Sequence, residues 1–164
     1  MPTITAGRKA PDFELPTTDG KVFSLTPALE RGLVLAAFFK VSCPTCQYAF
    51  PFLERLYQQL RAAGAQIWGI SQDEVGDSQL FAKEFGITFP TLIDEYPYEA
   101  SRQYGLQYVP TLFLIAPGAR VEIMSDGFCK ADFLAIQKSL GQHLGVNPPP
   151  LFQPNEHVPE FKPG

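Results

Sequence analysis

The stretch that decides the fold is LVLAAFFKVSCPTCQYAFPFLERL, residues 33–56. It begins with seven apolar residues, 33–39, whose length and composition are typical of a strand buried on both faces of a sheet. Cys43 and Cys46 follow in a C-x-x-C spacing, and apolar residues then recur every three or four positions. That recurrence predicts an amphipathic helix over about residues 46–63. Two cysteines therefore stand where a buried strand gives way to a helix.

The rest of the chain alternates in the same way. Strands are predicted at residues 66–71, 89–94, 111–115 and 120–124, and helices at 77–85, 98–104 and 130–144. Nearer the N-terminus, two short apolar segments around Asp19-Gly20 predict a β-hairpin within residues 10–25. Strands that alternate with helices build a parallel core through right-handed crossovers, and the last two strands add an antiparallel edge. The expected fold class is α/β, with helices on both faces of one mixed central sheet.

The length of 164 residues predicts a single domain, which we assign to residues 1–146. In residues 147–164, six of eighteen positions are proline, so this tail is expected to be extended or mobile, without regular secondary structure. Its two aromatic residues, Phe152 and Phe161, could dock on the domain itself or on a second subunit. We expect a monomer or a weak dimer.

Composition excludes several classes of function. The net charge is −4 and basic residues never form a run, so no nucleic-acid partner is expected. The longest apolar run has seven residues, against the roughly 20 that span a bilayer, so no membrane segment is expected. The first residues show no apolar leader, which favours the cytoplasm, or the periplasm if a leader has been removed.

The position of the cysteine pair is chemically informative. Cys43 falls at the start of a helix, where free N–H groups and the helix dipole favour an anion, and Pro44 suits the first helical turn. A thiolate is the attacking species in disulfide exchange. We therefore interpret Cys43 as the nucleophile and Cys46, one turn deeper, as the resolving thiol. Attack on a disulfide would give a mixed disulfide, and Cys46 would then close the 43–46 bridge.

A metal site is the main structural alternative for a C-x-x-C. A structural zinc needs two further ligands, and the candidates are Cys129, His143 and His157, which are single and far apart in sequence. We therefore expect no metal and no cofactor beyond the redox-active cysteines. Cys129 is interpreted as a small buried hydrophobic residue rather than a second redox group.

Two segments carry a family resemblance. Residues 35–46, LAAFFKVSCPTC, continued by FPFLERL at 50–56, resemble the thioredoxin superfamily, and YGLQYVPTLFLI at 104–115 is similar to its second conserved segment. Within that superfamily, these segments resemble TlpA-like thiol–disulfide oxidoreductases and redoxins of the AhpC/TSA type. The resemblance covers about residues 7–145. It implies a thioredoxin-like three-layer sandwich with an N-terminal hairpin extension.

The resemblance also implies a substrate-binding surface. The Val109–Pro110 peptide bond would be cis and would face the cysteine pair, with the backbone of Val109 pairing with an extended substrate strand. Pro44 and Thr45, between the two cysteines, complete the expected contact surface. The implied partners are a protein that carries a disulfide and an upstream donor of electrons.

This sequence also departs from the family. Ala37 and Ala49 stand where relatives carry a buried carboxylate that manages the proton of the second cysteine, and Ser42 replaces the usual tryptophan. Lys40, three residues before Cys43, has two interpretations. Its stem could lie on apolar surface with the ammonium in water, or the ammonium could stabilise the Cys43 thiolate.

Two other functions compete with thiol–disulfide exchange. A thiol peroxidase needs the pattern P-x-x-x-T-x-x-C, but Ala36 and Lys40 occupy those proline and threonine positions before Cys43. Arg102 lies at a spacing where peroxiredoxins often carry an activating arginine, a weak signal. The third possibility is a non-enzymatic metal or binding module, against which the intact cysteine pair argues.

Overall fold

The computed structural model describes residues 2–164, whose core is a five-stranded sheet in the order β5-β4-β3-β6-β7. The strands are β3 (Val34–Phe39), β4 (Gln66–Ser71), β5 (Thr91–Ile93), β6 (Thr111–Ala116) and β7 (Arg120–Asp126). β3 pairs in parallel with β4 and antiparallel with β6. The mixed α/β sheet and the thioredoxin-like fold predicted from the sequence are confirmed.

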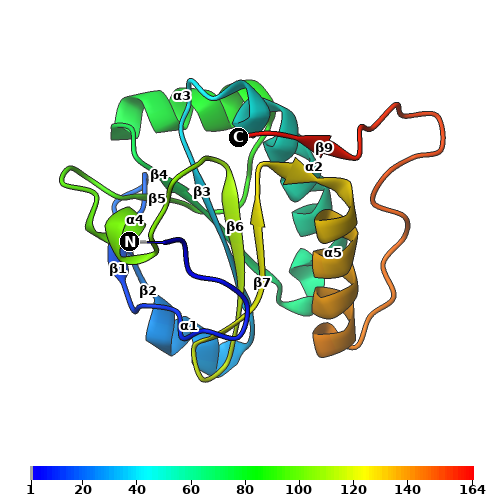
Figure 1. The fold of residues 1–164 in the computed structure, drawn as a ribbon, viewed down its shortest axis with the longest axis horizontal. Helices are drawn as coiled ribbons and strands as arrows, with labels where there is room; N and C mark the ends of the chain where they lie inside the picture. The colour runs from blue at the N-terminus through cyan, green and yellow to red at the C-terminus, as the bar shows by residue number, and fades with distance from the viewer. Residues whose placement is uncertain (1) are drawn as a thin grey trace.

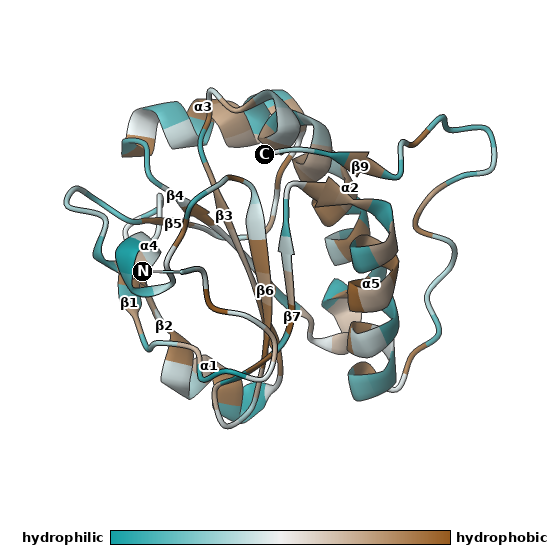
Figure 2. Cartoon of the chain, viewed as in Figure 1, coloured by the Kyte–Doolittle hydropathy of each residue, from teal (hydrophilic) through white to brown (hydrophobic). Residues whose placement is uncertain are grey.

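Helices cover both faces of the sheet, as Figure 1 shows. One face carries α2 (Pro44–Leu60), α3 (Val75–Phe85) and α5 (Lys130–Leu144), and the other carries α1 (Leu25–Arg31) and α4 (Glu99–Gln103). Successive side chains of a strand point to opposite faces. Leu35 and Phe39 of β3 therefore join the α2 side of the core, while Val34 and Phe38 join the other. Figure 2 shows the hydrophobic colour concentrated along these strands and the inner sides of the helices.

The N-terminal hairpin is confirmed, with β1 (Glu14–Pro16) antiparallel to β2 (Val22–Ser24). The sequence interpretation was wrong directly after it, where Leu25 was assigned to a strand and α1 was not predicted. The helix has only seven residues, and Pro27 lies within its first turn, where a missing N–H is tolerated. Its apolar residues Leu25, Ala28 and Leu29 are buried, so tertiary packing stabilises a helix too short to persist alone.

The proline-rich tail is also more ordered than its composition predicts. Phe161–Lys162 forms β9, which pairs antiparallel with β8 (Phe128–Cys129), so the expectation of no regular structure was wrong at these residues. Leu151 is fully buried, and the Phe152 ring packs edge-on against Phe52 of α2. In Figure 1 the tail leaves the end of α5, loops outside that helix and returns toward the start of α2. The proposed boundary at residue 146 stays a prediction.

No helix in the described part of the chain is long and apolar enough to cross a membrane.

Candidate active site

Cys43 caps the N-terminus of α2. Its backbone is extended (φ −83°, ψ 115°), Pro44 is the first helical residue, and the Cys46 N–H donates to the Cys43 Sγ at 3.1 Å. A cap that accepts a hydrogen bond from the third helical residue satisfies one of the free N–H groups of the helix end. The Cys43 sulfur thus lies where the helix dipole and an N–H donor both favour negative charge.

Cys46 lies one turn inside α2 and is fully buried. Burial raises the pKa of the Cys46 thiol, and hydrogen bonding and charge interaction with Cys43 raise it further. A hydrogen bond to the Lys40 backbone lowers this pKa, but its effect is smaller than that of burial. The two cysteines therefore occupy different environments: a half-buried sulfur at a helix end and a protonated thiol in the core.

The loop before β6 meets Cys43 across 66 residues of chain. The Val109–Pro110 peptide bond is cis, as the resemblance implies, and the Cys43 thiol donates to the Val109 carbonyl oxygen at 3.3 Å. Two hydrogen bonds hold this loop: Thr111 Oγ1 donates to the Tyr108 carbonyl at 2.7 Å, and the Gly127 N–H donates to the Pro110 carbonyl at 2.8 Å. A second cis bond, at Tyr96–Pro97, was not expected from the sequence.

Asp73 holds the segment that leads into Cys43. Its Oδ2 accepts from the Val41 N–H at 2.8 Å, and Gln47 Nε2 donates to the Val41 carbonyl at 2.9 Å. Sequence reasoning missed Asp73, although it directly follows a buried strand parallel to the one before the cysteines. Carboxyl ends of parallel strands lie at one edge of a sheet, so this position could have been flagged. Lys40 is exposed, and its side chain makes no hydrogen bond or ion pair within residues 2–164.

The two alanines that replace the family's carboxylates are fully buried in the same part of the core as Cys46. The buried carboxylate of α2 lies further along the helix, at Glu54. It accepts from the Thr88 N–H at 2.7 Å, from Thr88 Oγ1 at 2.6 Å and from Gln58 Nε2 at 2.6 Å. These donors satisfy Glu54 as a structural anchor for the segment before β5.

The residues between the cysteines differ in exposure. Pro44 is exposed, whereas Thr45 is buried and its Oγ1 donates to the Pro163 carbonyl at 2.6 Å. The proline-rich tail therefore reaches the start of α2. Four residues expected to contact substrate, Pro44, Thr45, Val109 and Pro110, thus flank Cys43, and the tail touches this group.

The remaining candidate ligands lie apart from one another. Cys129 is half-buried at the start of α5, and burial raises the pKa of its thiol. His143 is on the last turn of α5, 3.6 Å from Glu122 Oε1, and His157 lies in the tail. No cluster of three potential metal ligands occurs within residues 2–164.

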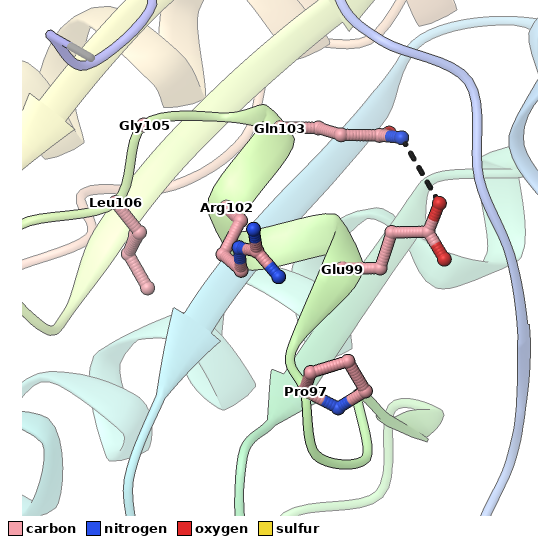
Figure 3. Close-up of a pocket in the computed structure, with 6 residues that line it drawn as sticks. All are labelled: Pro97, Glu99, Arg102, Gln103, Gly105 and Leu106. Carbon is pink, nitrogen blue, oxygen red and sulfur yellow. Dashed lines mark hydrogen bonds between the residues drawn. The ribbon is translucent and has the colours of Figure 1, made fainter.

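A separate hollow lies on α4, shown in Figure 3. It is lined by Pro97, Glu99, Arg102, Gln103, Gly105 and Leu106. Arg102 is exposed there, and the hydrogen bonds of the Cys43 sulfur are to Cys46 and Val109 instead. The arginine expected of a peroxidase is therefore not among the groups bonded to Cys43.

A family model described as AhpC/TSA matches residues 6–124. The chain belongs to the AhpC/TSA family. The thiol-disulfide oxidoreductase ResA of Geobacillus thermodenitrificans is 31% identical over 128 residues, which cover 76% of this chain and 71% of that protein. A Coxiella burnetii protein that carries the name peroxiredoxin bcp is 32% identical over 104 residues, covering 63% and 68% of the two chains.

Solved structures extend the likeness to the fold. A thiol:disulfide interchange protein, DsbE, from Chlorobium tepidum superposes with a TM-score of 0.76 and 29% identity, covering 87% of this chain and all of that one. A protein disulfide isomerase structure from Bacteroides thetaiotaomicron has a TM-score of 0.80 at 23% identity, covering 88% of this chain and 95% of that one, and supports the fold alone.

Proposed function

We propose that this chain is a thiol–disulfide oxidoreductase in which Cys43 and Cys46 exchange electrons with disulfides of proteins. The observation that carries the proposal is the asymmetry of the pair. One sulfur is half-buried and accepts an N–H at a helix end, and the other is fully buried with a raised pKa. Disulfide exchange needs one thiolate ready to attack and one thiol held in reserve.

The reaction follows from these positions. The Cys43 thiolate attacks one sulfur of a substrate disulfide, a Cys43–substrate bond forms, and the other substrate sulfur leaves as a thiolate. Cys46 then loses its proton and attacks the Cys43 sulfur, which releases the second substrate thiolate and closes the Cys43–Cys46 bridge. Two electrons pass to the substrate, Cys46 supplies one proton and solvent supplies the other, and an upstream dithiol restores the reduced pair.

The proton of Cys46 needs an acceptor in the second step. Because alanine occupies both positions at which relatives carry a carboxylate, we assign that proton to the substrate thiolate released in the first step. This acceptor is created only after Cys43 has formed the mixed disulfide. Cys46 would thus stay protonated until its attack is needed.

Substrate would bind beside the cis-proline. Within the described residues the Val109 N–H donates no hydrogen bond, so the loop offers a free main-chain donor next to Cys43. An extended substrate segment could use it by strand addition. Pro110 has no N–H and so adds no second main-chain donor at this position. In a reducing compartment such as the cytoplasm, the dithiol would act as a reductant.

Trapping with serine variants tests these roles. A Cys46→Ser variant should accumulate mixed disulfides with insulin, whose chains are joined by disulfides, because the resolving thiol is missing, whereas Cys43→Ser should not. Cys129→Ser is the matched control and should turn over like the wild type. Equal trapping by the Cys43 and Cys46 variants would contradict the assigned roles.

The similarity to a protein named as a peroxiredoxin makes peroxide consumption the comparison assay. We expect insulin reduction to be the faster reaction, since the threonine and arginine of a peroxide site are absent beside Cys43. If the protein consumes peroxide faster than it reduces insulin, the proposed function is wrong and the protein is a thiol peroxidase.

A further inference from the structure

The proline-rich tail is fastened first to α5 and then to α2 before it reaches the cysteines. Gln137 Nε2 donates to the Pro149 carbonyl at 2.9 Å, and Arg55 Nη1 donates to the Leu151 carbonyl at 2.8 Å. Arg55 also makes two charged hydrogen bonds to Glu156, at 2.7 and 2.9 Å. These contacts direct the end of the tail back toward the start of the helix.

The last four residues, 161–164, which we call the strap, then cross the candidate active site. β9 pairs with β8, and the Lys130 N–H donates to the Glu160 carbonyl at 3.0 Å. Lys162 Nζ lies 4.9 Å from the centre of the Tyr48 ring, on α2. The Pro163 carbonyl accepts from Thr45 Oγ1, as described above.

The strap approaches the cis-proline loop very closely at its end. A Cβ placed on Gly164 would lie 2.5 Å from the Val109 carbonyl oxygen and 3.4 Å from the Tyr108 side chain. A Cβ placed on Gly127, before β8, would lie 2.5 Å from the Lys162 carbonyl oxygen. Real side chains do not fit such gaps, so glycine at both positions lets the backbones meet. The strap therefore packs closely against β8, Thr45 and the cis-proline loop, and we call this surface the docking groove.

The groove and the proposed substrate surface are the same place. Thr45 and Val109, both expected to contact substrate, are among the residues that the strap touches. The strap is an extended segment with one edge on β8, which is the geometry of strand addition. It does not cap the Cys43 sulfur, whose hydrogen bonds are to Cys46 and Val109.

We propose that the strap holds the docking groove for an extended strand of a disulfide-bearing protein, and that such a substrate must displace it to reach Cys43. This inference rests on the proposed function. It names the substrate class as proteins that can present an extended segment beside their disulfide and pair with β8. Small disulfides need no such groove and should reach Cys43 with the strap in place.

The size of the effect follows from occupancy. Apparent affinity falls by the fraction of molecules whose groove is open, so a strap seated about nine-tenths of the time would lower kcat/KM for a protein substrate about tenfold. Residues 161–164 are not part of the proposed chemistry. Removing them should therefore raise kcat/KM without changing the reaction of Cys43 with a small reagent.

Two variants test the proposal. One lacks residues 161–164, and the other is the full chain with Gly164→Val, whose side chain cannot fit against the Val109 carbonyl. Gly76→Val is the matched control, because an added Cβ there meets nothing within 4 Å. Each protein is assayed for kcat/KM with insulin and for its reaction rate with the small disulfide DTNB. If thermal unfolding shows that the shortened chain is less stable than the wild type, the insulin kinetics of Gly164→Val decide whether the strap proposal holds.

We expect faster insulin reduction without the strap, a smaller gain for Gly164→Val, no gain for Gly76→Val and similar DTNB rates for all. The peptide VPEFKPG, residues 158–164, should raise the KM for insulin of the shortened chain, and a scrambled peptide should not. If all variants reduce insulin with the same kinetics as the wild type, the proposal that substrate displaces the strap is wrong, while the proposed function stays intact. If no variant reduces insulin and none reacts with DTNB faster than free cysteine does, the proposed function and the strap both fall.

Discussion

Replacing Leu151 with alanine tests whether the proline-rich tail is part of the folded core. Leu151 is fully buried and belongs to the same core cluster as Leu53 of α2 and Leu140 of α5. Truncating a buried leucine removes apolar contacts and leaves a cavity, which costs about 2–5 kcal/mol of unfolding free energy. For a domain of this size each kcal/mol corresponds to roughly 2–4 °C, so the melting temperature should fall by roughly 4–20 °C.

Urea unfolding followed by far-UV circular dichroism measures this change. We expect a lower midpoint with an unchanged slope, because the surface exposed on unfolding stays nearly the same. Leu80→Ala is the matched control: Leu80 is 66% exposed on α3, and its truncation should change stability by about 0.5 kcal/mol or less. If Leu151→Ala proves as mild as this control, the tail does not pack as described, and the path of the strap loses its support.

Three further predictions concern charge and reactivity. Arg55 lowers the pKa of Glu156 from 4.5 to about 2. Their ion pair therefore stabilises the fold above pH 4.5, and this stabilisation is lost as the pH falls toward 2. The melting temperatures of the wild type and Glu156→Gln should converge over that range, and a difference that does not shrink would contradict the prediction. Iodoacetamide at neutral pH should modify Cys43 well before the fully buried Cys46, as mass spectrometry of peptides can show; preferential labelling of Cys46 would invert the assigned roles. Because the Lys40 side chain is exposed and bonds to no group within residues 2–164, Lys40→Met should leave the alkylation rate of Cys43 unchanged, and a slower rate would show that the ammonium stabilises the thiolate.

Much of the site could be predicted because its signals are local. A run of seven apolar residues predicts a central strand, and the periodic apolar residues after Cys46 predict a helix that starts beside Cys43. The cis bond at Val109–Pro110 came from a different source. Nothing in the composition of that dipeptide distinguishes cis from trans, and only the family resemblance of the surrounding segment implied it.

The elements that were missed depend on distant partners. α1 is too short for a clear period and is stabilised by burial of its apolar face. The place of Asp73 after a parallel strand could have marked it as a residue near the site, but its hydrogen bond to the Val41 N–H, 32 residues away, is seen only in the structure. The strap could not be predicted from the sequence for the same reason. Proline content describes only local backbone preference, and it says nothing about a contact with Thr45, 118 residues away along the chain.

The sequence by itself determined the layered α/β fold and the cysteine pair at a helix start, because apolar periodicity and helix-end preferences act over a few residues. Tertiary structure alone decided that the Val109 carbonyl accepts a hydrogen bond from the Cys43 thiol and that residues 161–164 cross the same groove. Those contacts join segments far apart along the chain, and their geometry is set by the packing of the whole core.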